Sequence, residues 1–312
     1  MKPSLWIGVV CCIFLHASLL QAQTRYPSRP VTLIVPFAAG GSGDATMRYI
    51  ADQLQKSRGV SMVVENRPGG GATIGLSAVA RSAPDGYTVG LISTSPVTVT
   101  PHFQKVPYDP LKDFTFLTQY TVSPAPVYVQ AESRFKTIEE MIEFGRANPG
   151  KLRWATAAPR GTNHIAMEIA LRQQKVSGTF VAFGGGAEPL IALLGGNLEF
   201  VVGTDFGPSL RNKQVRLLAE SGPKKIVGHP EVRTFAELGY PLILPIFLGI
   251  GGPAGLSPEV VKFWEDGIRE LVGTPGFNEM LGRFFSPPDF LDSKAFTQRI
   301  RDAHAGTGKA VR

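Results

Sequence analysis

The sequence predicts an α/β fold with parallel strands, built from two successive α/β halves. Two observations support this prediction. Short apolar segments rich in β-branched residues alternate with amphipathic helical segments along the chain. In addition, each half contains a strand that continues through a loop of small residues into a helix, at residues 36–44 and 156–164. In such sheets, ligands bind beyond the carboxyl ends of the strands, where both loops would lie.

The first of these loops has the features of an anion site. Residues 31–35 form an apolar run, a glycine-rich turn follows, and an amphipathic helical pattern begins at Asp44. A helix N-terminus offers unpaired N–H groups, and Gly40, Gly41 and Gly43 let a ligand approach the main chain closely. The alternative is that the glycines only turn a strand into a helix. Neither a P-loop nor a dinucleotide fingerprint fits, because the Lys and the third glycine are missing.

The N-terminus has the features of an export signal. Lys2 precedes an apolar stretch at residues 5–20 that is too short to span a bilayer comfortably, and the small residue Ala22 follows. We therefore expect a cleavable signal peptide over residues 1–22, with an uncleaved membrane anchor as the alternative. Both cysteines of the chain lie in this segment, so the exported protein needs no disulfide, which favours the periplasm.

The net charge of +7 does not indicate a nucleic-acid partner. A basic balance can reflect nucleic acid, a membrane surface or acidic ligands. Here the Lys and Arg residues are scattered, and the nearest approaches to clusters, Lys224-Lys225 and Arg299–Arg301, carry no interleaved aromatic residues. A solvated surface explains this charge, and export argues further against nucleic acid.

The first half is predicted to be β-α-β-α-β. After the opening strand, loop and helix, strands are expected at residues 61–65 and 87–93, with a short helix at 73–81 between them. Thr94 and Ser95 follow the last of these strands. We expect both hydroxyls at the same sheet edge as the glycine-rich loop.

The second half repeats the pattern of the first. Residues 114–120 and 125–130 are expected strands, the first of which carries the chain into this half. Thr137 and Glu140 form a capping box for a helix, and Thr162 is expected to cap the helix after the second loop. Further strands are expected at 152–155, 179–182, 199–202 and 215–219, further helices at 189–194, 257–271, 275–284 and 294–303, and a return crossing at 242–249.

The sequence predicts no catalytic set and no metal site. No histidine beyond the export segment is paired at metal-ligand spacing, and the nucleophile elbow G-x-S-x-G is absent. His164 is interpreted as a structural residue, with a general base as the alternative. Asp44 and Asp205 could form a carboxylate pair across a cleft, although the helix dipole favours Asp44 simply as a first-turn residue.

A set of long motifs gives the chain a resemblance to a known family. The motifs are YPSRP at 26–30, VPFAAGG at 35–41, ENRPGGG at 65–71, APDGYT at 83–88, PYDPLKDF at 107–114 and ANPGKL at 147–152. With these motifs the chain resembles the periplasmic substrate-binding proteins of tripartite tricarboxylate transporters, also called the Bug family, over residues 26–302.

The resemblance implies a two-lobed periplasmic-binding-protein fold of the Venus-flytrap type (type II) with two crossover strands. Lobe 1 would comprise residues 23–121 and 246–312, and lobe 2 residues 122–245. The ligand would be a small carboxylate, held between the lobes by main-chain N–H groups, hydroxyls and ordered water. The protein would deliver this ligand to the permease subunits of a tripartite tricarboxylate-type transporter. No cofactor is implied, and we expect a monomer.

The candidate ligand-binding residues come from both lobes. The resemblance places a first-lobe cradle at residues 37–42 and a second-lobe cradle around residues 156–162, and it matches Asp44 and Asp205 to acidic positions. The full candidate set is Phe37, Ala38, Ala39, Gly40, Gly41, Ser42, Asp44, Thr94, Ser95, Thr156, Ala157, Arg160, Gly161, Thr162 and Asp205.

Three departures from the family pattern are expected to touch the cleft and so bear on the identity of the ligand. Residues 158–160 replace a glycine-rich stretch, Gly184 stands where Lys is frequent, and residues 245–247, ending in Phe247, replace an aromatic pair. Arg160 could add a charge-assisted contact to a carboxylate. The alternative is an exposed loop arginine.

The leading functional hypothesis is a periplasmic solute-binding protein that is not an enzyme. A second hypothesis is a sensor of the same fold that presents its ligand state to a receptor rather than a permease. A third is an exported hydrolase, against which the missing nucleophile elbow counts.

Overall fold

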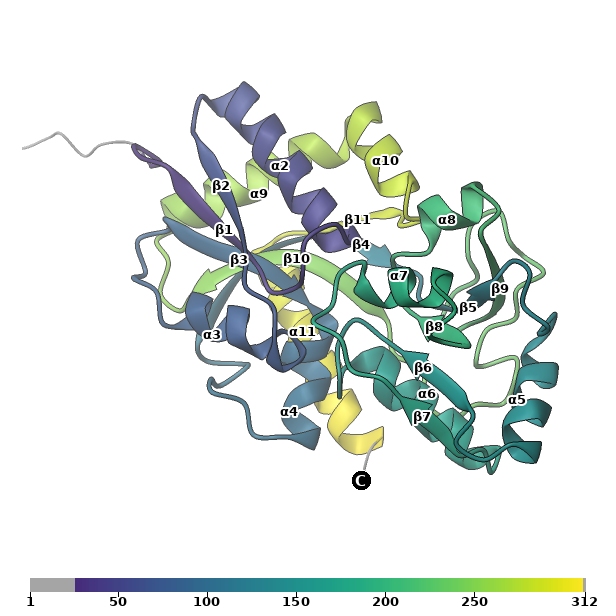
Figure 1. Cartoon of the computed structure of the whole chain (residues 1–312). Coiled ribbons are helices and arrows are strands. Elements are labelled where there is room, and N and C mark those ends of the chain that lie inside the picture. Colours follow the sequence, from purple (N-terminus) through teal and green to yellow (C-terminus); the bar gives the residue numbers. More distant parts are fainter. Residues whose placement is uncertain (1–25, 311–312) are drawn as a thin grey trace, which may run out of the picture.

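The computed structural model describes residues 26–310, so the signal peptide expected at residues 1–22 lies outside the described part. The chain forms two lobes, each built on its own β-sheet (Figure 1). We call the six-stranded part lobe 1 and the five-stranded part lobe 2. Within residues 26–310, no helix combines the length and the apolar character needed to cross a membrane.

The sheet of lobe 1 is mixed, with strand order β11-β4-β10-β3-β1-β2. Its strands are β1 (Val31–Val35), β2 (Met62–Asn66), β3 (Thr88–Ser93), β4 (Phe114–Ser123), β10 (Ile246–Pro253) and β11 (Pro288–Leu291). β1 pairs in parallel with β2 and β3, whereas β10 runs antiparallel to β3 and β4. The edge strand β11 was not expected from the sequence, because this short segment has no apolar alternation and pairs irregularly with β4.

Helices cover both faces of this sheet (Figure 1). They are α2 (Ser42–Arg58), α9 (Pro258–Val272) and α10 (Pro275–Gly282) on one face, and η1 (Gly70–Ala72), α3 (Thr73–Ala80), η2 (Ser95–Val99), α4 (Thr100–Phe103) and α11 (Ser293–Ala310) toward the other. Successive residues of a strand point to opposite faces. Accordingly, Leu33 belongs to the core cluster that contains Trp264 of α9, whereas its neighbour Ile34 belongs to the cluster on the other face that contains Phe296 of α11.

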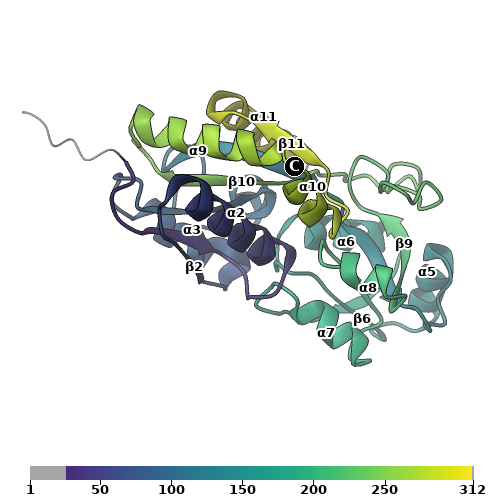
Figure 2. The same ribbon diagram turned by 90° about the horizontal axis from the view of Figure 1, so that it is seen from above.

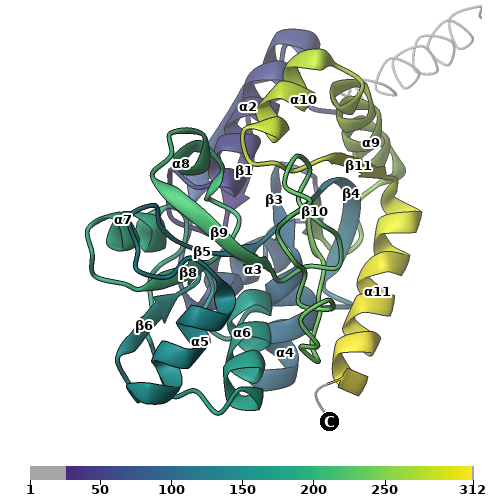
Figure 3. The same ribbon diagram turned by 90° about the vertical axis from the view of Figure 1, so that its right-hand side faces the viewer.

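Lobe 2 has a five-stranded sheet of order β7-β6-β8-β5-β9 (Figure 3). Its elements are β5 (Pro126–Gln130), α5 (Ile138–Ala147), β6 (Leu152–Ala155), α6 (Thr162–Gln173), β7 (Gly178–Phe180), α7 (Glu188–Leu194), β8 (Phe200–Val202), α8 (Gly207–Arg211) and β9 (Val215–Glu220). Trp154 of β6 is only 2% exposed and stacks on Phe200, with ring centroids 5.6 Å apart. Trp154 also contacts the ring of His164 edge-on, so the core of lobe 2 continues to the end of the second-lobe loop.

The structure confirms one of the predicted helix caps and contradicts another. Thr137 caps α5 as expected by accepting from Glu140 N at 3.2 Å, and Ser257 caps α9. The predicted cap at Thr162 is wrong, because Gly161 takes the cap position and Thr162 is the first helical residue. The helical turns η2 and α4 were missed, since their proline-interrupted, β-branched sequence has low helix propensity.

The chain passes between the lobes twice. It leaves the first sheet at the end of β4 and enters the second at β5, and it returns through the segment that leads into β10 (Figure 2). The expected boundary between residues 121 and 122 falls inside β4, which continues to Ser123 because that residue still pairs with Ile246. Phe247 and Val122 pair next to them, so the two connections run side by side.

Glu220 is buried at this junction. One carboxylate oxygen, Oε1, accepts hydrogen bonds from Ala125 N at 2.9 Å and Gly222 N at 2.7 Å. The other oxygen, Oε2, is buried without a hydrogen-bond partner in the described chain. Burial raises the pKa of the Glu220 carboxyl to about 7, because the two N–H donors only partly offset the loss of water.

Candidate functional site

A pocket lies between the two lobes, at the carboxyl ends of β1 and β3 and of β6 and β8. Its cavity volume is about 70 Å³, which admits several water molecules, so a ligand enclosed there must be small. Among the candidate residues, those that line the pocket are Phe37, Ala38, Gly41, Ser42, Asp44, Thr94, Ser95, Thr156, Ala157 and Asp205. The loops at 36–44 and 156–164 therefore face one shared space.

The first-lobe loop meets lobe 2 directly across this pocket. Ser42 N donates to Asp205 Oδ1 at 2.6 Å, and the Ser42 and Thr204 hydroxyls are 2.9 Å apart. A Cβ atom added to Gly41 would lie 2.7 Å from Gly186 Cα, closer than side chains approach a backbone. Gly41 thus permits the close contact between the lobes.

Asp44 holds the shape of the glycine-rich loop. Its carboxylate accepts from Gly40 N at 3.0 Å, from Asn66 Nδ2 at 2.9 Å and from Arg48 Nε at 3.0 Å. Burial acts to raise the pKa of the Asp44 carboxyl, but the donors on Arg48, Gly40 and Asn66 outweigh it and keep the pKa below its ordinary value. Asp44 is therefore an ionised residue whose charge is already compensated.

The second-lobe loop is held by its own side chains. Thr156 Oγ1 accepts from Ala158 N at 3.3 Å, and His164 Nδ1 accepts from Arg160 N at 2.9 Å. The His164 ring stacks on Phe180 at 3.9 Å, and burial lowers the pKa of His164. The neutral ring can accept that hydrogen bond, so the structure supports the structural interpretation of His164 rather than a general base.

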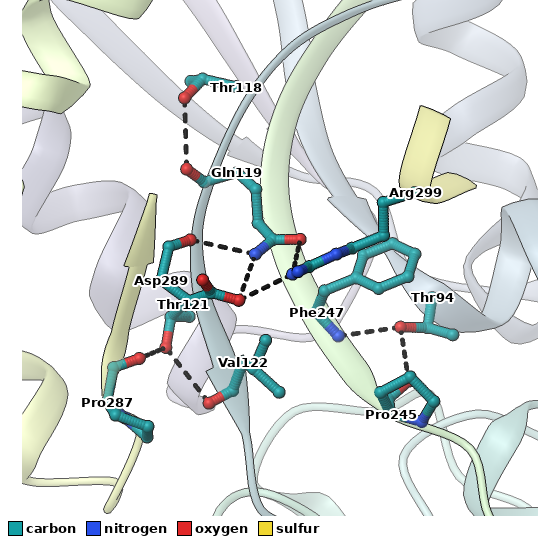
Figure 4. Close-up of polar contacts among 10 residues, drawn as sticks. All are labelled: Thr94, Thr118, Gln119, Thr121, Val122, Pro245, Phe247, Pro287, Asp289 and Arg299. Carbon is teal, nitrogen blue, oxygen red and sulfur yellow. Dashed lines mark hydrogen bonds and ion pairs between the residues drawn. The ribbon is translucent and has the colours of Figure 1, made fainter. Parts of the chain in front are cut away.

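The hydroxyls of Thr94 and Ser95 already have protein partners. Figure 4 shows Thr94 Oγ1 donating to Pro245 O at 3.0 Å and accepting from Phe247 N at 2.9 Å. Ser95 Oγ accepts from Thr162 N at 3.0 Å and also lies 3.0 Å from the Thr162 hydroxyl. Thr94 thus fixes the return segment at the pocket, and Ser95 joins the two lobes.

The other candidates lie outside the pocket lining. They are Ala39, Gly40, Arg160, Gly161 and Thr162. The Arg160 guanidinium is exposed and donates to Gln104 Oε1 at 3.1 Å, which favours the interpretation of an exposed loop arginine over a ligand contact. Gly161 N donates to Ala158 O and so serves the turn itself.

The expectation that all three departures from the family pattern touch the cleft is wrong for Gly184, and the departure at residues 245–247 reaches the pocket through Ile246 rather than Phe247. Phe247 alternates with the pocket-lining Ile246 and Leu248 along β10, so its side chain points to the opposite face, where it packs on Phe296 with ring centroids 5.7 Å apart. Gly184 N donates to Glu188 Oε2 at 2.7 Å outside the pocket. Ala158 and Ile246, in contrast, line the pocket.

Sequence reasoning missed two residues that carry unused hydrogen-bonding groups. Ser93, at the end of β3, is 5% exposed, and its Oγ has no partner in the described chain. Asn163 Oδ1 is likewise buried without a partner there, and both residues line the pocket. The hydroxyl-rich run after β3 could have pointed to Ser93. For Asn163 the only available indication was its place in the first turn of a predicted helix.

Two first-turn helix residues, one from each lobe, line the pocket. Gly43 of α2 and Asn163 of α6 line it, and within residues 26–310 neither main-chain N–H has an acceptor. Such N–H groups, at the positive ends of helix dipoles, bind carboxylates and other anions. Over the same residues there is no cluster of three or more His, Cys, Asp and Glu side chains that could hold a metal ion.

Comparison with known proteins gives relatives along most of the chain. A UPF0065 protein of Cupriavidus necator is 32% identical over 286 residues, covering 91% of this chain and 87% of that protein. The solved periplasmic binding protein BugD is 25% identical with a TM-score of 0.82, covering 91% of this chain and 97% of its own. The R. palustris protein Rpa4515, solved with adipate, is 26% identical with a TM-score of 0.83 and the same coverage.

The family model for the tripartite tricarboxylate transporter family receptor, TctC, matches residues 46–312. This match confirms the resemblance drawn from the sequence motifs, and the solved neighbours confirm the two-lobed type II fold. The family is one of substrate-binding receptors, whose solved members include periplasmic binding proteins. The chain therefore belongs to the tripartite tricarboxylate transporter receptor family.

Proposed function

We propose that this protein captures a small carboxylate in the periplasm and delivers it to the membrane permease of a tripartite tricarboxylate-type transporter. The observation that carries the proposal is the shared pocket, which is lined from α2 of lobe 1 and from α6 of lobe 2 by a first-turn residue whose main-chain N–H has no acceptor in the described chain. Rpa4515, solved with adipate, supports a carboxylate ligand.

Closure of the lobes explains how uncharged hydrogen-bond donors are sufficient to bind a carboxylate. The contacts of Ser42 with Thr204 and Asp205 and of Ser95 with Thr162 join the lobes around the pocket. Closing excludes water, and hydrogen bonds to a carboxylate are stronger in the less polar interior. The closed arrangement also brings together surfaces of both lobes that a permease can distinguish from the open form.

Ligand-dependent thermal stability tests this proposal. The exported protein, residues 23–312, is screened against mono- and dicarboxylates and amino acids. A ligand that binds only the folded state and is present at one hundred times its Kd should stabilise the protein by about 2.7 kcal/mol. If no organic acid in a broad set shifts the melting temperature, capture of a carboxylate is refuted. Co-purification of the protein with permease subunits, rather than with a receptor, then tests the transport role against the sensor hypothesis.

A further inference from the structure

Residues 282–286, which join α10 to β11 in lobe 1, form a turn that packs against lobe 2. Two neighbouring phenylalanines of this turn belong to different cores. Phe284 is 8% exposed in a core cluster of lobe 1, whereas Phe285 packs on a core cluster of lobe 2 that contains Phe206. The turn lies outside the pocket lining, so it is a separate contact between the lobes.

The side chain of Phe285 is held by aromatic and cationic groups of lobe 2. Its ring stacks on that of Phe206, with centroids 5.5 Å and planes 19° apart, and the ring of His229 lies 5.4 Å away. The Arg211 guanidinium lies 5.1 Å from the centre of the same ring, and its Nη2 donates to Gly282 O at 2.6 Å. Stacked rings and a cation near an aromatic ring attract each other. Lobe 2 therefore holds both the ring and the backbone of the turn.

The lobe 2 side of this contact is continuous with the pocket. Asp205 lines the pocket, and Phe206 and Gly207 follow it directly in the chain. A Cβ atom added to Gly207 would lie 2.9 Å from Phe284 Cα, so the start of α8 meets the turn backbone to backbone. An opening movement that carries Asp205 away from lobe 1 therefore also separates Phe206 from Phe285.

Phe285 has a backbone conformation that favours glycine. Its φ is +56°, in the left-handed region. Phe285 N donates to Gly282 O at 3.1 Å and Ser286 N to Leu281 O at 3.2 Å, the pattern of a Schellman turn, whose left-handed residue is usually glycine. An aromatic residue costs free energy here that glycine would not, and strained residues of this kind concentrate at ligand clamps and switch regions. The contacts of the ring with lobe 2 offset this cost.

We propose that Phe285 is a positioning residue whose contact with lobe 2 stabilises the closed lobes and slows ligand release; this inference rests on the proposed function, in which the lobes close on a ligand. When the lobes part, the Phe285 ring loses Phe206 and is exposed to solvent, so the contact stabilises the closed state alone. A larger closed population raises the apparent affinity. Because the ring lies outside the pocket and makes its contact as the lobes close, its effect falls on dissociation rather than on association.

The variant Phe285→Gly distinguishes this role from a purely structural one. Glycine suits the left-handed turn, so the protein should stay folded, which its melting temperature without ligand checks. With adipate and the other mono- and dicarboxylates of the thermal-shift screen as probes, stopped-flow kinetics should show dissociation about tenfold faster and association unchanged. Calorimetric titration should show binding about tenfold weaker. Phe285→Asn, which also tolerates the left-handed conformation, should have the same effect.

Phe290→Ala is the matched control. Phe290 of β11 is likewise a half-buried ring beside an arginine, with the Arg269 guanidinium 4.4 Å from the ring centre, but both residues belong to lobe 1. This variant should keep the wild-type dissociation rate. If Phe285→Gly and Phe285→Asn released the ligand no faster than Phe290→Ala, the proposal for Phe285 would be overturned while carboxylate capture stood. Binding of none of the acids to the wild-type protein would refute the proposed function, and this inference with it.

Discussion

Replacing Gly41 with alanine is expected to weaken ligand binding roughly ten- to hundredfold while both lobes stay folded. The added methyl would lie 2.7 Å from Gly186 Cα and 3.1 Å from its carbonyl carbon. These are backbone atoms of the opposite lobe, so the contact cannot be relieved by a change of side-chain rotamer. Gly41 has a φ of −83°, which alanine adopts readily, so the effect should fall on closure rather than on the loop.

If the ligand binds tightly only to the closed state, the apparent affinity falls in proportion to the fraction of the protein that can close. Titration calorimetry with a ligand found by thermal shift measures the loss, and small-angle scattering reports whether the ligand still compacts the protein. Gly306→Ala is the matched control, because no atom lies within 4 Å of the added methyl in α11. If Gly41→Ala bound ligand as tightly as Gly306→Ala, the close approach of the lobes would not be needed for binding.

The second large effect concerns Glu220 at the junction between the lobes. Its pKa is raised by burial to about 7 in the folded state, against an ordinary value of 4.5. Between these values the folded protein binds more protons than the unfolded chain, so stability falls as pH rises. We expect Glu220 to remove about 3 kcal/mol of the free energy of unfolding between pH 4.5 and 7, with no further loss from this group above that range.

Glu220→Gln should remove this contribution, because the amide stays neutral across the range and can still accept from Ala125 N and Gly222 N. Urea unfolding at several pH values measures the slope for both proteins. Glu143→Gln, an exposed change in α5, serves as the control and should keep the wild-type slope. A Glu220→Gln protein whose stability changed with pH as steeply as the wild type would show that the carboxyl is ionised throughout.

Local patterns predicted the elements well where hydrophobic period and capping agreed. Residues 31–35 form β1 as expected, and Ser257 followed by Pro258 starts α9. The failures occurred where tertiary contacts override local propensity. Residues 95–103 are helical despite two prolines and several β-branched residues. That segment is tied to the C-terminal helix, where His304 Nδ1 lies 3.0 Å from Val97 O, a contact that local patterns do not contain.

The sequence predicted that the two loops form the candidate site, but it did not predict which of their side chains line the pocket. Gly41 and Ser42 face the pocket as the strand–loop–helix pattern suggested. The roles of Arg160 and Phe247 depended on which way each side chain points, and a single sequence does not fix this. Ser93 emerged only when burial and hydrogen bonding were known, because an unpartnered hydroxyl is a property of its three-dimensional surroundings.

A crystal structure of residues 23–312 with a ligand found by thermal shift would be the most direct test of carboxylate capture between the lobes. We expect the ligand density to lie between the turn before Asp44 and the turn before Thr162, with its carboxylate within hydrogen-bonding distance of Gly43 N or Asn163 N. A ligand bound elsewhere, or two turns facing away from each other around it, would contradict the proposed function.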